Sequence, residues 1–315
     1  MAIIVQEGLR GLFYAPYYAA LARGAYEQEG VEVRFVRAPS PDAAPQALFD
    51  GTVDVSWGGP MRVNQLYDQR PDGDLVCFGE AVTRDPFLLV GRTPRSGFAL
   101  AELMRVRVAT VSEVPTPWLC LQADLQEAGV DIAAMKSGDR VNTGLSMAQQ
   151  LQALQLDELD AVQFFEPYVS EALAAHNGTL LYAACTRGPT VYTTFICSRD
   201  GLARHRDAFA ALTRALQKLQ DWIAAQGPAE LARVTAPFFP EVPAALFLAS
   251  IERYCRDGVW ARHAEVSRSG FARLSHSLNL GGFIASPMVY ESCVHNFDAP
   301  ARFDQPVQWA AGEKS

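Results

Sequence analysis

An apolar strand that runs into a proline able to open a helix occurs five times before residue 170. The five pairs are 3–5 with Pro16, 31–36 with Pro41, 53–57 with Pro60, 106–109 with Pro117, and 161–165 with Pro167. Proline suits the first helical turn because the N–H that it lacks has no helical partner there. Strands that alternate with helices in this way are typical of a parallel sheet.

These helix starts predict where a ligand binds. In open α/β sheets, ligands lie at the carboxyl ends of the strands, which is where such helices begin. Each start presents N–H groups without helical partners and a partial positive charge. We therefore expect several helix N-termini to face one crevice, and we predict a protein that binds a small molecule.

Length and charge narrow the class of partner. A chain of 315 residues, 49% of them apolar, is long enough for two lobes with sizeable cores. A net charge of −8 and a pI of about 5.2 argue against nucleic acid or an anionic membrane surface as the main partner. No apolar stretch approaches the ~20 residues that span a membrane, so we expect no membrane insertion. Residues 1–5 lack the basic start of a signal peptide, which predicts a cytoplasmic protein; the alternative is a periplasmic protein whose leader was removed.

Cysteine and histidine placement favours neither a metal site nor a bound cofactor. The six cysteines lack any Cys-x-x-Cys pair, and we expect reduced, mostly buried thiols at Cys77, Cys120, Cys185, Cys197, Cys255 and Cys293. The five histidines do not cluster at metal-ligand spacing. Cys120 falls in the first turn of a helix expected over 117–128, a place that lowers thiol pKa values. No base adjoins it in the sequence, and we expect no catalytic residue.

The order of the expected elements divides the chain. Strands and helices alternate over 2–80, with one helix over 16–29, and the alternation restarts over 100–185. An isolated strand follows at 192–197. Helical periodicity then dominates over 205–225, 228–236, 243–256 and 267–278, and the tail beyond about 299 is polar.

This order predicts an α/β fold of two lobes, with mixed sheets flanked by helices and a helical C-terminal part. We expect residues 1–85 and 195–315 to form the first lobe and residues 92–188 the second. The chain would cross between them near 84–92 and 188–198.

Three segments resemble one group of proteins. Residues 15–33 (APYYAALARGAYEQEGVEV) resemble its opening helix, which leads to the second strand. Residues 47–55 (ALFDGTVDV) resemble its "aLxxGxvDv" segment, and residues 154–161 (LQLDELDA) resemble its "aLxxGeiDa" segment. Phe165-Glu166-Pro167 resembles the aromatic-Glu-Pro step that follows. The group comprises sulfonate-, taurine- and nitrate-binding proteins and thiamin-pyrimidine-synthase-like proteins.

The resemblance implies a type 2 periplasmic-binding-protein fold, in which two α/β lobes close on a ligand. Most members are exported and serve transporters, which implies a transporter permease or a regulatory protein as partner of a monomer. A sulfinate desulfinase and a pyrimidine synthase share the fold. Their catalytic cysteine or cysteine-rich motif has no match in residues 8–15.

Candidate ligand-binding residues in the expected first lobe follow two strands. In the loop after the first strand we select Arg10, Phe13 and Tyr14, since the two aromatic rings can stack on a flat ligand or simply anchor the helix. After the third strand, Trp57, Gly58, Gly59 and Arg62 combine exposed backbone N–H groups with a guanidinium that suits carboxylate, sulfonate or phosphate. The alternative for this loop is a tight turn with a solvated arginine.

Candidates in the expected second lobe and at the crossings are Ser112, Thr116, Glu166 and Thr193. Thr116 is the expected N-cap of its helix, with ordinary capping as the alternative to ligand contact. Glu166 either accepts a hydrogen bond from the ligand or only complements a helix dipole. Thr193 lies at a crossing, where hinge and pocket roles overlap.

These observations predict a solute-binding protein of the ABC-transporter type that holds a small anionic or aromatic ligand between its lobes. We expect the ligand's flat or apolar part to stack near Tyr14 or Trp57. One alternative is an enzyme on the same scaffold that acts on a pyrimidine or an organosulfur compound. Another is a cytoplasmic sensor that presents its closed form to a partner protein.

Overall fold

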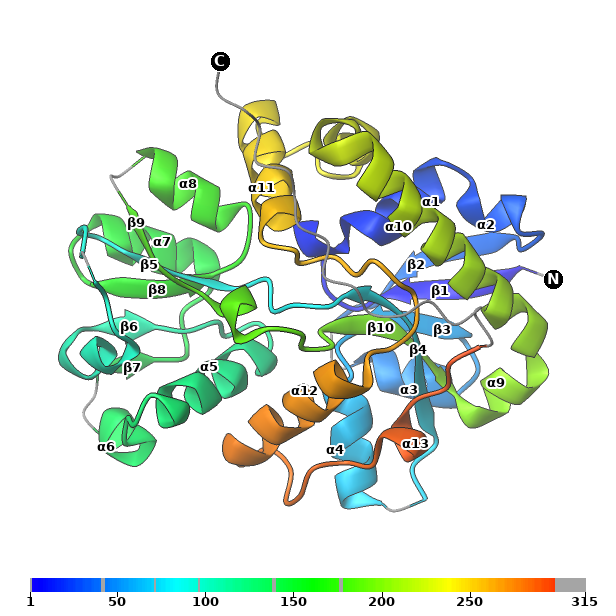
Figure 1. Ribbon diagram of the computed structural model, residues 1–315, viewed down its shortest axis with the longest axis horizontal. Helices are drawn as coiled ribbons and strands as arrows, with labels where there is room; N and C mark the ends of the chain where they lie inside the picture. The colour runs from blue at the N-terminus through cyan, green and yellow to red at the C-terminus, as the bar shows by residue number, and fades with distance from the viewer. Residues whose placement is uncertain are drawn as a thin grey trace.

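The strands of this protein form two separate five-stranded mixed sheets, each flanked by helices (Figure 1). The computed structural model describes residues 2–40, 43–70, 72–95, 97–137, 140–175 and 178–297. We call the half built on the first sheet the first lobe and the half built on the second sheet the second lobe. The predicted fold class is confirmed.

The first sheet has the strand order β2-β1-β3-β10-β4. β1 runs parallel to β2 and β3, whereas β10 lies antiparallel between β3 and β4. The strand expected to be isolated is therefore central. The first-lobe elements are β1 (Ile3–Glu7), α1 (Ala15–Ala22), α2 (Ala25–Gln28), β2 (Val33–Arg37), α3 (Ala44–Phe49), β3 (Val55–Gly58), α4 (Met61–Gln69), β4 (Leu75–Val82), β10 (Thr193–Ser198) and α9 (Arg199–Arg204). The single helix expected over 16–29 is broken at Gly24, which adopts a left-handed φ of 60°.

The second sheet has the order β7-β6-β8-β5-β9, with β6 parallel to β7 and β8, and β5 antiparallel to β8 and β9. Its elements are β5 (Leu88–Gly91), β6 (Val108–Ala109), α5 (Thr116–Glu127), α6 (Ile132–Ser137), β7 (Val141–Asn142), α7 (Met147–Gln155), β8 (Ala161–Phe164), α8 (Tyr168–Ala175) and β9 (Thr179–Ala183). The sequence did not predict α6 or β7, because such short elements carry too little periodicity.

The C-terminal helices contact both lobes. They are α10 (Arg206–Thr235), α11 (Ala244–Arg256), α12 (Arg268–Leu280) and α13 (Tyr290–Cys293). α10 packs on α1, with a break at Gly227 that separates the two helices expected there. α12 packs on α5 of the second lobe and on α4 of the first (Figure 1). Pro41 and the tail beyond 299 lie outside the described residues.

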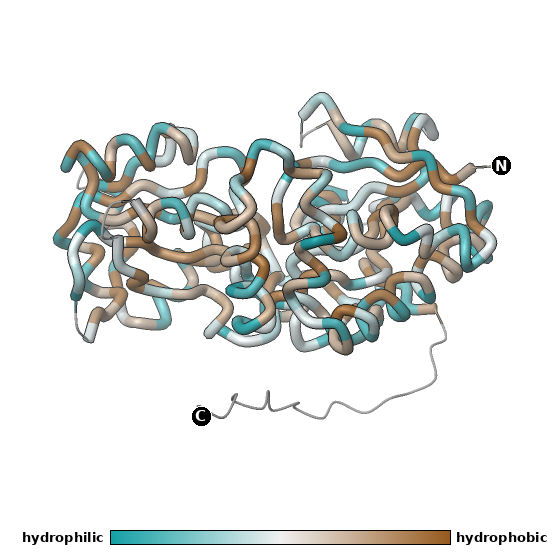
Figure 2. The backbone as a smooth tube through the Cα atoms, turned by 90° about the horizontal axis from the view of Figure 1, so that it is seen from above, coloured by the Kyte–Doolittle hydropathy of each residue, from teal (hydrophilic) through white to brown (hydrophobic). Residues whose placement is uncertain are grey.

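Short 3-10 turns complete the described elements: η1 (Leu12–Tyr14), η3 (Leu100–Arg105), η4 (Ala184–Arg187) and η5 (Ala236–Phe238). Apolar residues concentrate along the strands inside each half (Figure 2). Buried side chains cover both faces of the first sheet, since Trp57 belongs to one hydrophobic cluster and Ile196 to another. A third cluster, which includes Leu89 and Leu125, lies within the second lobe.

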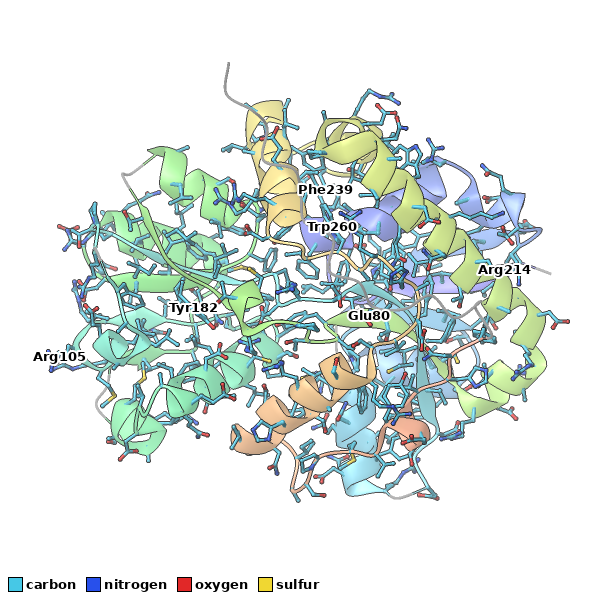
Figure 3. All side chains as sticks on the ribbon, in the orientation of Figure 1. Glu80, Arg105, Tyr182, Arg214, Phe239 and Trp260 are labelled. Atoms are coloured by element: carbon cyan, nitrogen blue, oxygen red, sulfur yellow. The ribbon has the colours of Figure 1, made fainter. Side chains whose placement is uncertain are left out.

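A buried ion cluster ties the two crossing segments to α5. The Arg187 guanidinium donates from Nη1 to Asp85 Oδ2 at 2.9 Å and from Nε to Asp124 Oδ1 at 2.6 Å. Tyr182, labelled in Figure 3, donates its hydroxyl hydrogen to Asp124 Oδ2 at 2.9 Å. Burial raises the pKa of Asp85 to about 6, although the Arg187 charge opposes that shift. The cluster therefore depends on its single cation.

Glu80 ties the C-terminal helices to the first sheet (Figure 3). Its Oε2 accepts a hydrogen bond from the Ser267 N–H at 2.7 Å, and Ser267 is the N-cap of α12. Its carbonyl oxygen accepts from Gln220 Nε2 of α10 at 2.7 Å. Burial raises the pKa of Glu80 from 4.5 to about 7.

We predict that Arg187→Met destabilises the protein by about 3–5 kcal/mol, because Asp85 and Asp124 would remain buried without their cation. Urea unfolding followed by circular dichroism measures the loss. The matched control is Arg233→Met, whose ion pair with Glu230 is exposed and should contribute far less to stability. Equal losses in the two variants would contradict a structural role for the cluster.

We also predict that Glu80 makes the free energy of unfolding depend on pH. Its folded-state pKa lies above its unfolded value, so its stabilising contribution is complete below about pH 4.5 and is lost as the pH rises through about 7. The change amounts to roughly 3 kcal/mol. Unfolding titrations at a series of pH values should give a shallower curve for Glu80→Gln than for the wild type, and the exposed control Glu252→Gln should keep the wild-type slope. Parallel curves for the wild type and Glu80→Gln would refute the assignment.

Candidate functional site

Two helix starts from opposite lobes meet at the centre of the molecule. α4 begins at Met61 directly after β3, and α5 begins at Thr116 after β6. The Thr116 hydroxyl donates to Met61 Sδ at 3.0 Å, which joins the two first turns. Neither helix has a side-chain N-cap in the described structure. Both first turns therefore keep N–H groups that a ligand can use.

A cavity of about 100 Å³ lies between the lobes at this point. The starts of four of the five helices expected to face one crevice contribute to its wall: those of α1, α3, α4 and α5. The wall comprises Gly8, Leu9, Phe13, Tyr14, Ala44, Pro45, Leu48, Ser56, Trp57, Gly58, Gly59, Met61, Arg62, Leu75, Phe87, Val114, Thr116, Tyr192 and Ile196.

Seven of the predicted site residues lie in this wall: Phe13, Tyr14, Trp57, Gly58, Gly59, Arg62 and Thr116. Thr116 is the first residue of α5, and Pro115 holds the cap position, so the expected N-cap role of Thr116 is wrong. Thr116 instead contributes the hydroxyl that reaches across to the first lobe.

Arg62 supplies the only side-chain cation among the described wall residues. It lies in the first turn of α4, where its Nη1 donates to Gln65 Oε1 at 3.1 Å. Burial lowers the pKa of Arg62, but a guanidinium starts from so high a value that it stays charged. A half-buried cation beside two helix starts favours an anion in the cavity.

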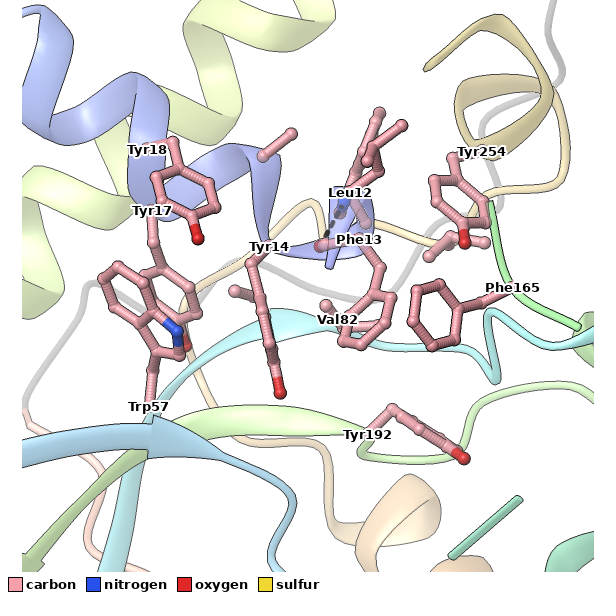
Figure 4. Close-up of a cluster of buried hydrophobic side chains, with 14 of the residues drawn as sticks. Leu12, Phe13, Tyr14, Tyr17, Tyr18, Trp57, Val82, Phe165, Tyr192 and Tyr254 are labelled. Carbon is pink, nitrogen blue, oxygen red and sulfur yellow. Dashed lines mark hydrogen bonds between the residues drawn. The ribbon is translucent and has the colours of Figure 1, made fainter. Parts of the chain in front are cut away.

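The aromatic rings are less available than the sequence suggested (Figure 4). Tyr17 stacks on Trp57 at 4.7 Å and 4°, and Phe35 stacks on it at 5.0 Å and 25°. Trp57 is only 1% exposed, so the expected stacking of a ligand on its ring does not fit this structure. Tyr14 lies at the wall but packs against Phe13 at 4.3 Å, and burial raises the pKa of Tyr14 above its ordinary value.

Thr193 and Arg10 lie outside the wall. Thr193 is fully buried beside Tyr14. Arg10 turns away to the loop between α10 and α11, where Nη2 donates to the Phe238 carbonyl oxygen. The Arg10 guanidinium also lies 4.7 Å from the centre of the Phe239 ring and 3.6 Å from Glu241 Oε1. We selected Arg10 because an arginine suits an anion site. Its position after β1 does not determine the direction in which its side chain points.

Ser112 also lies outside the wall. It is exposed, and its hydroxyl donates to the Leu145 carbonyl oxygen at 2.9 Å. Its neighbour Glu113 accepts from the Met147 N–H at 2.9 Å, at the start of α7. These contacts stabilise loops of the second lobe and do not involve the cavity wall.

Glu166 is fully buried and joins α8 to α11. Its carboxylate accepts hydrogen bonds from the Ser170 N–H at 2.9 Å, from the Ser250 hydroxyl at 3.1 Å and from Arg253 Nε at 2.6 Å. Its own N–H donates to the Tyr254 hydroxyl at 2.8 Å. The sequence left two roles open for Glu166, a ligand contact and a position at a helix start. In the structure Glu166 lies at a helix start, and residues of α11 are among its partners.

The cavity also contains residues that the sequence analysis did not select. Three of them are Leu48, Leu75 and Ile196, which are ordinary core residues by sequence pattern. No local sequence signal distinguishes them from other core residues. Cys120 is buried, and burial raises the pKa of its thiol to about 12, which outweighs the expected effect of the helix start. All six cysteines are free, and the described residues hold no cluster suited to a metal ion.

Two α/β lobes with a cavity between them, walled by helix starts from both, define the type 2 periplasmic-binding-protein fold. The model of the NMT1-like family matches residues 89–237, which confirms the relationship expected from the sequence. YtlA, a proposed binding protein of Bacillus subtilis (strain 168), is 20% identical over 292 residues, which cover 92% of this chain and 86% of YtlA.

Solved structures share this fold across nearly the whole chain. The periplasmic aliphatic sulphonate binding protein SsuA from Escherichia coli superposes with a TM-score of 0.74 at 15% identity, covering 99% of this chain and 98% of SsuA. The periplasmic nitrate-binding protein NrtA from Synechocystis PCC 6803 gives 0.63 at 12% identity, covering 92% of this chain and 83% of NrtA. Both proteins are periplasmic, so they do not support the expected cytoplasmic location. No helix in the described part of this chain is both long enough and apolar enough to cross a membrane.

Proposed function

We propose that this protein is a solute-binding protein of the ABC-transporter type that holds a small anion between its lobes. The observation that carries the proposal is the meeting of the uncapped first turns of α4 and α5 beside Arg62 in one cavity. Helix starts and a guanidinium both favour negative charge at contact distance. The net charge of −8 opposes an anion only at long range, where salt screens it beyond ~10 Å.

The composition of the wall argues against the enzyme alternative. The described wall contains no cysteine, histidine, aspartate, glutamate or lysine. These residue types supply most general bases, so the hydroxyl groups of Ser56 and Thr116 have no such base in the wall to activate them. The same absence disfavours a cationic ligand, because no wall carboxylate would neutralise it.

The proposal also covers the cellular location of the protein and its partner. SsuA and NrtA are periplasmic proteins that bind a sulphonate and nitrate respectively, and by analogy this chain acts in the periplasm. Its partner is then the permease of an importer, which receives the ligand when the lobes open. We propose a monomer as the acting form.

We predict that Arg62→Ala weakens anion binding by about 1.5–3 kcal/mol, the usual scale for a hydrogen bond to a charged group. Isothermal titration calorimetry with nitrate and ethanesulfonate measures the change. Arg70→Ala is the matched control, because Arg70 follows the other end of α4 and is exposed. A thermal-shift screen gives the contrary outcome. If only amines raise the melting temperature of the protein, and they still do so in Arg62→Ala, the anion assignment is wrong.

We predict that Gly59→Val reduces anion affinity more than stability. A Cβ at Gly59 would lie 3.4 Å from the Tyr192 carbonyl oxygen, a contact that the fold can accept, whereas the side chain would obstruct approach to the backbone N–H groups. Calorimetry and urea unfolding on the same preparations separate the two effects. Gly144→Val, in a loop of the second lobe away from the cavity, is the control. Unchanged anion affinity in folded Gly59→Val would count against the cradle.

A further inference from the structure

The C-terminal end of α12 lies against the start of α5. α12 packs along α5 and also contacts α4 of the first lobe (Figure 1). At this end Gly281 meets Leu119, whose N–H donates to the Pro115 carbonyl oxygen at 3.1 Å and closes the first turn of α5. The same turn begins at Thr116, which is part of the cavity wall. The contact therefore falls on one of the two helix starts that meet at the cavity.

This contact is too close for a side chain at position 281. A Cβ on Gly281 would lie 2.6 Å from Leu119 Cδ2, 3.3 Å from Leu119 Cβ and 3.4 Å from Leu119 Cα. Another rotamer of Leu119 would clear the first atom, but the other two move only with the backbone. A residue larger than glycine therefore pushes α12 and α5 apart, slightly for alanine and further for a branched side chain.

Backbone conformation does not account for glycine at this position. Gly281 has a φ of −73° and a ψ of −4°, a right-handed conformation that L-residues adopt readily. Alanine is also the better helix former. The residue with a left-handed φ at this helix end is Gly282, at 73°, and a Cβ there would meet nothing within 4 Å. The close approach to Leu119 is thus the physical reason for glycine at 281.

The other end of α12 is held by the first lobe. Ser267, the N-cap of α12, donates its N–H to Glu80 Oε2 of β4 at 2.7 Å. A Cβ on Gly270 would lie 3.1 Å from the Val191 nitrogen, so the first turn of α12 packs closely on the segment before β10. Phe271 belongs to the same hydrophobic cluster as Val191. α12 therefore links the first sheet to the first turn of α5.

We infer that Gly281 is a positioning residue for the anion site. Because it lacks a side chain, α5 begins close against α12, and this contact sets where Thr116 lies relative to Met61 at the start of α4. The inference rests on the proposed function, in which the anion is held where the two helix starts meet. A side chain at 281 would displace one start relative to the other, and N–H groups bind an anion well only at hydrogen-bond distance.

Calorimetry with nitrate and ethanesulfonate on Gly281→Ala and Gly281→Val tests the inference. Affinity for both anions should fall in that order, and Gly281→Val should lose roughly ten-fold or more, as for one lost hydrogen bond to a charged group. The matched control Gly282→Ala strains the end of α12 without touching α5, so it should lower stability in urea and keep the wild-type affinity. Wild-type affinity in whichever variants of position 281 fold would overturn the inference and leave anion binding intact.

A second substitution separates positioning from a general loss of packing. Leu119→Ala removes the Cδ2 atom nearest to position 281 and leaves room for the methyl groups of valine. Adding Gly281→Val to Leu119→Ala should therefore cost less affinity than adding it to the wild type. Equal fold-losses in the two backgrounds would show that position 281 does not act through Leu119, and the inference would be wrong. Failure of the wild type to bind either anion would instead refute the proposed function.

Discussion

The meeting of α4 and α5 depends on the buried cluster around Arg187. Asp124 belongs to α5, Asp85 lies in the first crossing segment and Arg187 directly precedes the second, so one guanidinium joins all three. Arg187 is only 3% exposed in its side chain and Asp85 is fully buried. Two carboxylates at such depth need a cation, because burial without one costs several kcal/mol per ion. The cluster therefore holds α5, the helix that begins at Thr116, against both segments.

Contacts outside the two crossing segments also hold the lobes together. Glu166 and Arg253 join α8 to α11, and α12 bridges α4 and α5. Residues far apart in the sequence therefore enclose the same cavity. The buried pair contributes less net stability than its short distance suggests, since desolvation offsets much of the attraction. Its geometric effect is to fix α11 against the second lobe.

The cavity wall combines polar and apolar groups from several elements. Gly58, Gly59 and Arg62 lie in the wall with the first residues of α4 and α5, and aliphatic residues of α3 lie in the same wall. A ligand held by fixed N–H dipoles needs little reorganisation of the protein, which is the usual source of affinity in a small preformed site.

The sequence by itself determined the order of the longer strands and helices, the helix starts after β1, β3, β6 and β8, and the candidates Gly58, Gly59, Arg62 and Thr116. Hydrophobic periodicity, proline and glycine act over a few residues, so these features can be predicted locally. Only the tertiary structure decided which face each side chain presents. It covered Trp57 with Tyr17 and Phe35, directed Arg10 to Phe238, and gave Glu166 a partner 87 residues away in Arg253. Such partners come from distant segments, and no local pattern encodes a contact whose two halves meet only when the lobes pack.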